Sequence, residues 1–314
     1  MLPVDEALRR ILESVSPTDS QRVSLSEAAH RVLAEDVRAT LTQPPFDASA
    51  MDGYAVRAAD VAHLPATLNL IGEARAGKGF DGAVTQGSCV RIFTGAPVPA
   101  GADAIVIQEN TKSEGSSVTV VDGQPDPAHL RPRGGDFAEG QVLLPSGRRL
   151  DARAILLAAA MGHGTLAVRR RPVIAVLATG DELVEPGERP GPDQIVSSNP
   201  YGLAAMIAAA GGVPRLLGIA RDTPAALDGK LDAAADADVL VTTGGASVGD
   251  HDLVGPVLTA RGMTPGFWKI AMRPGKPLLF GRLGEQRVLG LPGNPVAALI
   301  CGRVFLVPLI DRLL

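Results

Sequence analysis

Cysteine and aromatic residues are scarce in this chain of 314 residues. The two cysteines, Cys89 and Cys301, stand far apart and in no spacing that is typical of metal ligands. We therefore expect two buried, reduced thiols in a cytoplasmic protein rather than a disulfide framework. Aromatic residues make up only 3% of the chain against 46% hydrophobic residues, so the cores must be built from alanine, valine, leucine and isoleucine.

Long apolar runs and a surplus of positive charge are also missing. No segment approaches the roughly 20 apolar residues of a transmembrane helix, and the apolar run at 154–160 is far too short. The N-terminus, MLPVDE, lacks the basic stretch and apolar core of a secretory signal. The net charge of −4 provides no general attraction to nucleic acid or to an anionic membrane. We therefore expect neither kind of partner, and an anionic ligand must be held by local groups.

The length predicts two or three domains, and the 36 glycines and 25 prolines predict many turns. Apolar residues recur at helical spacing over 4–12, which predicts a first helix. A second helix is expected from Ser24. Ser24 and Glu27 have the spacing of a capping box, and Ala28, Val32 and Leu33 follow at helical intervals.

A compact β-rich module is predicted for residues 43–123. Turn residues there separate short β-like runs at 68–71, 88–93, 104–108 and 118–121. The following segment, 136–168, has a turn-rich start and one apolar helix, 151–161, which ends at two nearby glycines.

Apolar strands and helices alternate in the rest of the chain. We expect strands at 173–178, 215–220, 239–242, 266–271, 278–280 and 288–291, and helices at 198–210, 223–235, 252–260 and 295–305. Repeated β–α–β units with apolar strands are typical of an α/β fold with a doubly wound, mainly parallel sheet. Such sheets bind their ligands at the carboxyl ends of the strands.

Glycines and acids follow four of these strands, at 179–183, 221–222, 243–252 and 292–294. Glycines at a strand end let backbone N–H groups turn toward a bound anion. Acids such as Asp250 and Asp252 can hold a divalent cation that bridges to phosphate oxygens. The sequence therefore predicts a site for a phosphorylated, metal-assisted ligand at this edge of the sheet.

Eight segments, in order along the chain, carry a family resemblance. They are FDASAMDGYA (46–55), RIFTGAPVP (91–99), RPRGGD (131–136), ATGDEL (178–183), TGGASVGDHD (243–252), FWK (267–269), RPGKP (273–277) and LPGNP (291–295). On these segments the chain resembles molybdopterin molybdenumtransferase, the MoeA/gephyrin E-domain family. The resemblance implies a molybdopterin-binding sheet domain (1–26 with 169–314), a linking and dimerisation region (27–45 with 136–168) and a β-rich module (46–135).

The resemblance also implies an enzyme of molybdenum cofactor biosynthesis. The family inserts molybdate, a co-substrate, into the dithiolene of adenylylated molybdopterin, hydrolyses the adenylate and releases AMP. A divalent metal, usually Mg²⁺, is the implied cofactor. A homodimer is implied in which the β-rich module of one protomer faces the sheet domain of the other, and the adenylyltransferase of the pathway is a further implied partner.

Motif matches carry the family's functional residues onto this chain. The residues expected to be catalytic are Asp52, Thr94, Asp136, Glu182, Asp222, Asp252, Lys269, Arg273 and Lys276. Those expected to bind the substrate are Thr243, Gly244, Gly245, Ser247, Gly249, Pro292, Gly293 and Asn294. The expected metal ligands are Glu182, Asp250 and Asp252. Carboxylates can hold a metal and orient a water, and basic side chains can offset the charge of an oxyanion.

Structural alternatives stand beside these roles. Capping a turn, ending a strand or starting a helix is the alternative for Asp52, Thr94, Asp136, Asp222, Asp250 and Asp252. Trp268 can stack on a pterin or adenine ring, although a lone tryptophan in a strand usually packs in a core.

Two departures from the family pattern concern Arg273 and the end of the chain. Arg273 occupies a basic position that is usually lysine, so a planar guanidinium replaces a compact ammonium. The family continues into a small β-rich domain where this chain stops, and we expect residues 304–314 to leave the sheet domain without a packing partner. The alternative functions are a form that binds the adenylylated substrate with little turnover, a related molybdopterin adenylyltransferase and a scaffold.

Overall fold

The computed structural model describes residues 1–245 and 253–314, and the chain divides into two compact units. Unit 1 contains Met1–Glu35, Gly147–Leu150 and Ala167–Leu314. Unit 2 contains Asp36–Ser146 and Asp151–Leu166.

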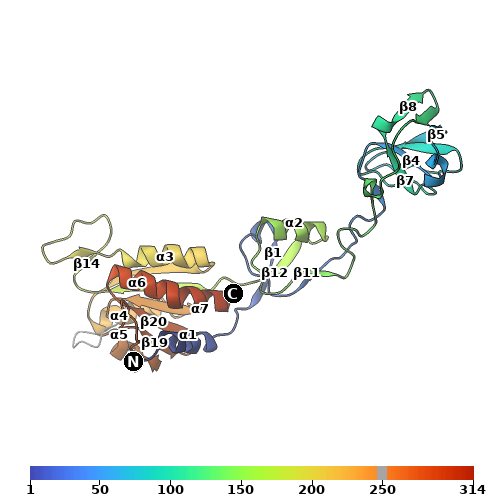
Figure 1. Ribbon diagram of the computed structural model, residues 1–314. Helices are drawn as coiled ribbons and strands as arrows, with labels where there is room; N and C mark the ends of the chain where they lie inside the picture. Colours follow the sequence, from blue (N-terminus) through green and yellow to red (C-terminus); the bar gives the residue numbers. More distant parts are fainter. Residues whose placement is uncertain (246–252) are drawn as a thin grey trace. The chain divides into compact units, whose positions relative to one another are not determined.

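Unit 1 is built on a six-stranded sheet with the strand order β16-β13-β17-β20-β19-β18 (Figure 1). The strands are β13 (Val173–Thr179), β16 (Val213–Ala220), β17 (Val239–Thr243), β18 (Thr264–Phe267), β19 (Leu279–Leu283) and β20 (Gln286–Leu291). The first four strands in the order are parallel, whereas β19 and β18 run antiparallel. The expected mainly parallel α/β sheet is therefore confirmed, although the strand expected at 266–271 begins and ends earlier.

The strands of this sheet bury side chains on both faces. In β13, Ile174 and Val176 belong to one hydrophobic cluster, and the alternating residues Ala175 and Leu177 belong to a second. Successive side chains of a strand point to opposite faces, so this division places one core on each side of the sheet.

Helices cover the two faces. Those in the first cluster are α1 (Val4–Glu13), α3 (Asn199–Ala210), α6 (Pro295–Cys301) and α7 (Val307–Leu313), and those in the second are α4 (Pro224–Asp232) and α5 (Val254–Ala260). Figure 1 shows α3 running alongside α6 and α7. This is the doubly wound arrangement that the alternating sequence predicts.

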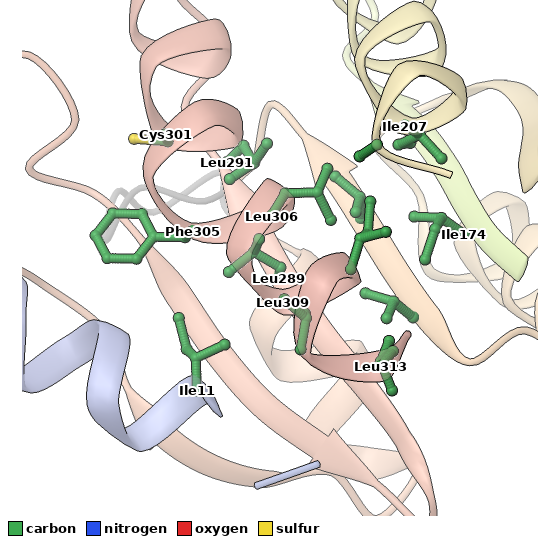
Figure 2. Packing of buried hydrophobic residues seen from close by; sticks show 14 of the residues in the cluster. Ile11, Ile174, Ile207, Leu289, Leu291, Cys301, Phe305, Leu306, Leu309 and Leu313 are labelled. Carbon is green, nitrogen blue, oxygen red and sulfur yellow. The ribbon is translucent and has the colours of Figure 1, made fainter. Parts of the chain in front are cut away.

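The end of the chain packs into the first core, which contradicts the expectation for 304–314. A π-helical turn, Gly302–Leu306, joins α6 to α7 and buries Phe305 and Leu306 completely. Figure 2 shows Phe305 close to Ile11 of α1. Leu309, which follows Phe305 on the same helical segment, belongs to the same core. The expectation failed because the apolar side chains of this segment pack against one face of the sheet.

The helix expected from Ser24 is also wrong. The chain instead forms β1 (Ser20–Ser24) and a single 3₁₀ turn, Leu25–Glu27. The Ser24 N–H does donate to Glu27 Oε2 at 3.2 Å, as a capping box requires. Beyond this turn, a β-bridge joins Leu33 to Val168, and the Ala34 N–H donates to the carbonyl of Ala167 at 3.0 Å. Pairing with distant segments therefore replaces local helix formation.

Unit 2 contains a second six-stranded sheet with the order β7-β4-β6-β5-β9-β8. Its strands are β4 (Gly53–Val56), β5 (Ala66–Ala74), β6 (Ser88–Ile92), β7 (Ala104–Ile107), β8 (Thr111–Glu114) and β9 (Ser117–Val120). All pairs are antiparallel except β5 with β6. This sheet matches the predicted β-rich character of the region.

Short elements complete the structure. The two-residue strands are β2 (Val37–Arg38), β3 (Ala48–Ser49), β10 (Leu130–Arg131), β14 (Leu183–Val184) and β15 (Ile195–Val196), and the longer elements are β11 (Val142–Leu144), β12 (Thr165–Arg169) and α2 (Ala152–Ala160). The 3₁₀ turns in unit 2 are Ala58–Val61, Gln108–Asn110 and Pro127–His129. Within the described ranges, no helix combines the length and the apolar character needed to cross a membrane.

Candidate functional site at the carboxyl edge of the sheet

A pocket of about 370 Å³ opens at the carboxyl edge of the parallel strands. Because β13, β16, β17 and β20 are parallel, the segments that follow them leave the sheet at one edge. Three of these four strand ends line the pocket, together with the start of α3 and the β14–β15 pair. The lining residues include Thr179, Glu182, Leu183, Ile195, Ser197, Asn199, Thr243, Gly244, Gly293 and Asn294.

Two glycines let the strand ends approach closely. Gly244 has a φ of +89°, and a Cβ at this position would lie 2.5 Å from the carbonyl oxygen of Thr179. A Cβ at Gly293 would lie 3.6 Å from the Cα of Gly244. Gly244 therefore has no space for a side chain, and the conformation itself favours glycine. The ends of β13, β17 and β20 thus meet as bare backbone at the floor of the pocket.

Asn199 joins two of these strand ends, and motif matching did not single it out. Its Nδ2 donates to Thr243 Oγ1 at 2.8 Å and to the carbonyl of Gly293 at 2.8 Å. The Thr243 hydroxyl in turn donates to the carbonyl of Pro292 at 3.5 Å. The signal in the sequence was an asparagine next to Pro200 at a helix start, which suggests only a helix cap.

A second set of hydrogen bonds holds the turn after β13, which carries Glu182. Arg221 Nη1 donates to the carbonyls of Asp181 at 2.8 Å and Leu183 at 3.1 Å. The Asp222 N–H donates to Asp181 Oδ1 at 3.2 Å. These bonds tie the end of β13 to the end of β16, its neighbour in the sheet. The exposed Glu182 follows β13 and lines the pocket, and the half-buried Asp222 follows β16.

The basic residues Lys269, Arg273 and Lys276 lie at the same edge of the sheet. β19 is antiparallel to β20, with Leu279 opposite Gly290, so β19 begins where β20 ends. β18 is antiparallel to β19 and therefore ends at that edge too. The connection 268–278 consequently leaves the sheet at its carboxyl edge, and all three basic side chains on it are exposed.

Trp268 packs against the second core. Its ring is so close to α5 that a Cβ at Gly255 would lie 2.2 Å from it. Its Nε1 is buried and has no hydrogen-bond partner among residues 1–245 and 253–314. The packing agrees with the structural alternative for this residue.

Asp52 and Thr94 come together in unit 2. The Thr94 N–H and its Oγ1 both donate to Asp52 Oδ1, at 2.8 and 2.9 Å. Arg91 donates to the carbonyl of Gly53 at 3.1 Å and lies over the ring of Phe93, with 4.8 Å between the guanidinium carbon and the ring centroid. The hydrogen bonds from Thr94, with the positive charge of Arg91, lower the pKa of Asp52 below its ordinary value.

Asp136 lies elsewhere in unit 2. Its N–H donates to the carbonyl of Gln43 at 3.0 Å, and the residue is exposed. The structure thus brings together Asp52 and Thr94, whereas Asp136 belongs to a separate turn.

Four of the expected site residues, Ser247, Gly249, Asp250 and Asp252, lie outside the described residues. In the part of the chain that the structure describes, no three His, Cys, Asp or Glu residues are grouped to hold a metal ion. Glu182 is the described member of the expected metal set, a single carboxylate at the pocket.

These features define a class of α/β protein that binds a ligand at the carboxyl edge of a doubly wound sheet and carries a β-rich second unit. Residues 2–162 match the family described as MoeA N-terminal region (domain I and II), and residues 175–312 match the family described as probable molybdopterin binding domain. The chain belongs to the MoeA family of molybdopterin molybdenumtransferases, as its motifs predict.

The similarity extends over nearly the whole chain. It is 39% identical over 306 residues to a molybdopterin molybdenumtransferase of Nostoc, covering 95% of this chain and 70% of that protein. It is 38% identical over 316 residues to a molybdopterin molybdenumtransferase of Haemophilus influenzae, covering 100% of this chain and 78% of that protein. A solved molybdopterin biosynthesis MoeA protein of Pyrococcus horikoshii has 31% identity and a TM-score of 0.89, over 100% of this chain and 80% of that one.

Proposed function

We propose that this chain is a molybdopterin molybdenumtransferase that inserts molybdate into adenylylated molybdopterin, hydrolyses the adenylate and releases AMP. The observation that carries the proposal is the pocket at the carboxyl edge, with bare glycine backbone at its floor and a basic connection at the same edge. Exposed N–H groups and basic side chains are the groups that bind oxyanions and phosphates.

The charges at this edge suit the substrates. Molybdate and the adenylate phosphate are both anionic, and Lys269, Arg273 and Lys276 are the exposed basic residues of the connection 268–278. Arg273 presents a planar fork of donors that matches two oxygens at once, whereas lysine presents a point charge. We assign the three residues to anion binding at this edge.

Mg²⁺ is the divalent metal we propose, and the described donor set is compatible with it. Mg²⁺ usually takes one or two carboxylates and completes its shell with water and substrate phosphate. Glu182 offers one carboxylate at the pocket, and we propose that Asp250 and Asp252 supply the others. When bound, the metal neutralises charge on the phosphate oxygens during hydrolysis.

We also propose a homodimer with composite active sites. The residues assigned to one protomer are Asp52, Thr94 and Asp136, and those assigned to the other are Glu182, Asp222 and Asp252. In support, α3 and α6, which both begin at the pocket, carry large exposed hydrophobic side chains: Tyr201, Val296 and Leu299 are 47%, 62% and 40% exposed. A second copy is the kind of partner that buries such side chains.

A mixing experiment tests this assembly. D52N and E182Q proteins are each expected to be inactive. If the sites are composite, subunit exchange between the two proteins creates heterodimers with one intact site, and activity partly returns. No recovery after proven exchange contradicts the composite site.

The remaining assignments follow from the same proposal. The free, buried cysteines Cys89 and Cys301 are compatible with the reducing cytoplasm, where we place the reaction. The adenylyltransferase of the pathway is the partner that would supply the adenylylated substrate. The alternative that this chain is itself an adenylyltransferase is not favoured, since the relatives that match over both units are named molybdenumtransferases.

AMP release is the decisive measurement. Purified protein is mixed with adenylylated molybdopterin, Mg²⁺ and molybdate, and AMP is quantified by chromatography, with D252A and E182Q as comparison variants. Molybdate-dependent AMP release that both variants lose supports the proposal. Tight binding of the substrate without AMP release supports the binding-only alternative, and consumption of ATP supports an adenylyltransferase.

A further inference from the structure

We propose that Asn199 is a positioning residue that fixes the floor of the pocket. Its single amide nitrogen donates to two acceptors, Thr243 Oγ1 and the carbonyl of Gly293, each at 2.8 Å. Thr243 is the last residue of β17, Gly293 follows β20, and Asn199 itself is the first residue of α3. One side chain therefore joins three elements at the place where Gly244 and Gly293 line the pocket.

Only a neutral amide fits both acceptors at this position. The –NH₂ group of asparagine has two hydrogens, so it can serve both oxygens, while a carboxylate of the same shape offers none. The side chain also lines the pocket. Its hydrogen bonds to the described residues both use Nδ2, which leaves Oδ1 to accept from a donor on the ligand.

A role in starting α3 does not account for this arrangement. The preceding residue, Ser198, is the cap of the helix and makes no side-chain capping bond. Pro200 at the start of the helix already fixes the backbone there. Asn199 directs its amide away from its own helix and toward the strand ends.

The consequence concerns catalysis, and it rests on the proposed function. Glycine turns are flexible, and reacting groups must be held within fractions of an ångström for efficient transfer. Without Asn199, the turns at 243–245 and 292–294 lose their shared tether, and the bound substrate loses its alignment with the basic connection. We expect kcat to fall more than the substrate affinity.

N199D is the informative variant because aspartate has nearly the size of asparagine but carries an accepting carboxylate oxygen in place of the donating –NH₂ group. We expect kcat/KM for AMP release to fall about 10-fold or more, as for a lost hydrogen bond to a partly buried group. A protonated carboxylic acid regains one donor, so the ratio of variant to wild-type kcat should rise as the pH falls. N199A has no donor at any pH, and its ratio should stay flat.

The control is Q194E, which adds the same charge in the adjacent loop. Gln194 uses its Oε1 to accept from the Gly191 N–H at 3.1 Å, and glutamate keeps that acceptor. We expect Q194E to retain wild-type turnover. A Q194E defect equal to that of N199D would overturn the positioning role in favour of a simple charge effect.

Hydrogen exchange tests the tether without any turnover. In N199D and N199A, the amides of 241–245 and 291–295 should exchange faster than in wild type, while those of β13 should not change. The exchange experiment remains informative if the wild-type protein releases no AMP. That result would contradict the proposed function but not the positioning role of Asn199. Unchanged exchange in both variants, or wild-type kinetics in N199D, overturns the positioning role.

Discussion

Thr94 donates two hydrogen bonds to a single carboxylate oxygen of Asp52, one from its backbone N–H and one from its hydroxyl. The two residues flank β4 and β6, neighbouring strands of the sheet in unit 2. Both bonds favour the charged form of Asp52, so they lower the pKa of its carboxyl group, with Arg91 adding its positive charge. An anionic side chain is thereby held in one orientation on an exposed surface.

Replacing Thr94 with valine removes the hydroxyl donor and keeps the backbone donor. We expect the pKa of Asp52 to rise toward its ordinary value without reaching it, because the backbone N–H is the larger of the two influences. Carbon-13 NMR titration of the carboxyl, assigned with D52N, measures this shift. T94S retains the hydroxyl and is expected to keep the lowered pKa. The lowered pKa of Asp52 also links the stability of the fold to pH. Its stabilising contribution is present above the unfolded-state pKa and is lost as the pH falls through the lowered value.

Asp238 should matter more for stability than its neighbour Asp236. Asp238 accepts from Arg170 at 2.7 and 2.9 Å and from the Val173 N–H at 2.7 Å, and its side chain is 22% exposed. Burial raises its pKa, but these hydrogen bonds outweigh burial and lower it overall. We expect D238A to reduce the free energy of unfolding by about 2 kcal/mol at neutral pH, after allowing for the screening of the half-exposed Arg170.

The matched control is D236A. Asp236 pairs with Arg215, but its side chain is 74% exposed, so solvent screens the pair and we expect a much smaller loss than for D238A. Urea unfolding followed by the fluorescence of Trp268, the one tryptophan of the chain, compares the two variants. The difference between wild type and D238A should shrink as pH falls through the lowered pKa of Asp238, and equal losses in the two variants at neutral pH would contradict the assignment.

Alanine substitutions at Gly244 and Gly262 distinguish the cost of steric crowding from the cost of backbone strain. Their φ angles are +89° and +91°, but a Cβ at Gly244 meets Thr179, whereas a Cβ at Gly262 has nothing within 4 Å. We expect G262A to reduce the free energy of unfolding by about 1 kcal/mol from strain alone. G244A should cost more, by about 1–3 kcal/mol, because the Thr179 backbone must move. Urea unfolding measures both, and equal costs would show that the strand ends are not closely packed.

Phe305 tests whether the end of the chain belongs to the core. Its side chain is fully buried, and we expect F305A to reduce the free energy of unfolding by about 3–5 kcal/mol through lost burial and a cavity. R303A, which alters an exposed residue of the same π-helical turn, should change it by no more than about 0.5 kcal/mol. Thermal or urea unfolding that finds F305A as stable as R303A would exclude this packing.

The doubly wound sheet could be predicted from sequence because its signals are local. Strands such as β13 and β17 are short apolar runs, and helices such as α4 begin at a capping threonine followed by proline. The segment after Ser24 shows the limit of local signals. Its capping box forms, but Leu33 and Ala34 bond with residues more than a hundred positions later, and no local pattern reports such pairing.

The site was predicted in part for the same reason. The glycines after β17 and β20 follow from the strand-end rule, and Gly244 and Gly293 do meet at the pocket. Asn199 was missed because its acceptors lie on two strands that are close only in the folded sheet. The basic connection was assigned by resemblance, and its location depends on the antiparallel pairing of β18 and β19, which the sequence pattern did not specify.

The hydrogen bond between Ala34 and Ala167 has a consequence for how the chain folds. All of unit 2 lies between these two residues in sequence, so it is an insertion whose two ends are held a few ångströms apart by unit 1. Closing a long loop costs entropy only once, and the cost grows slowly with the length enclosed. Unit 2 can therefore lengthen, shorten or unfold with little effect on the free energy of the sheet domain. The thermal stability of one unit can, in this respect, change without that of the other.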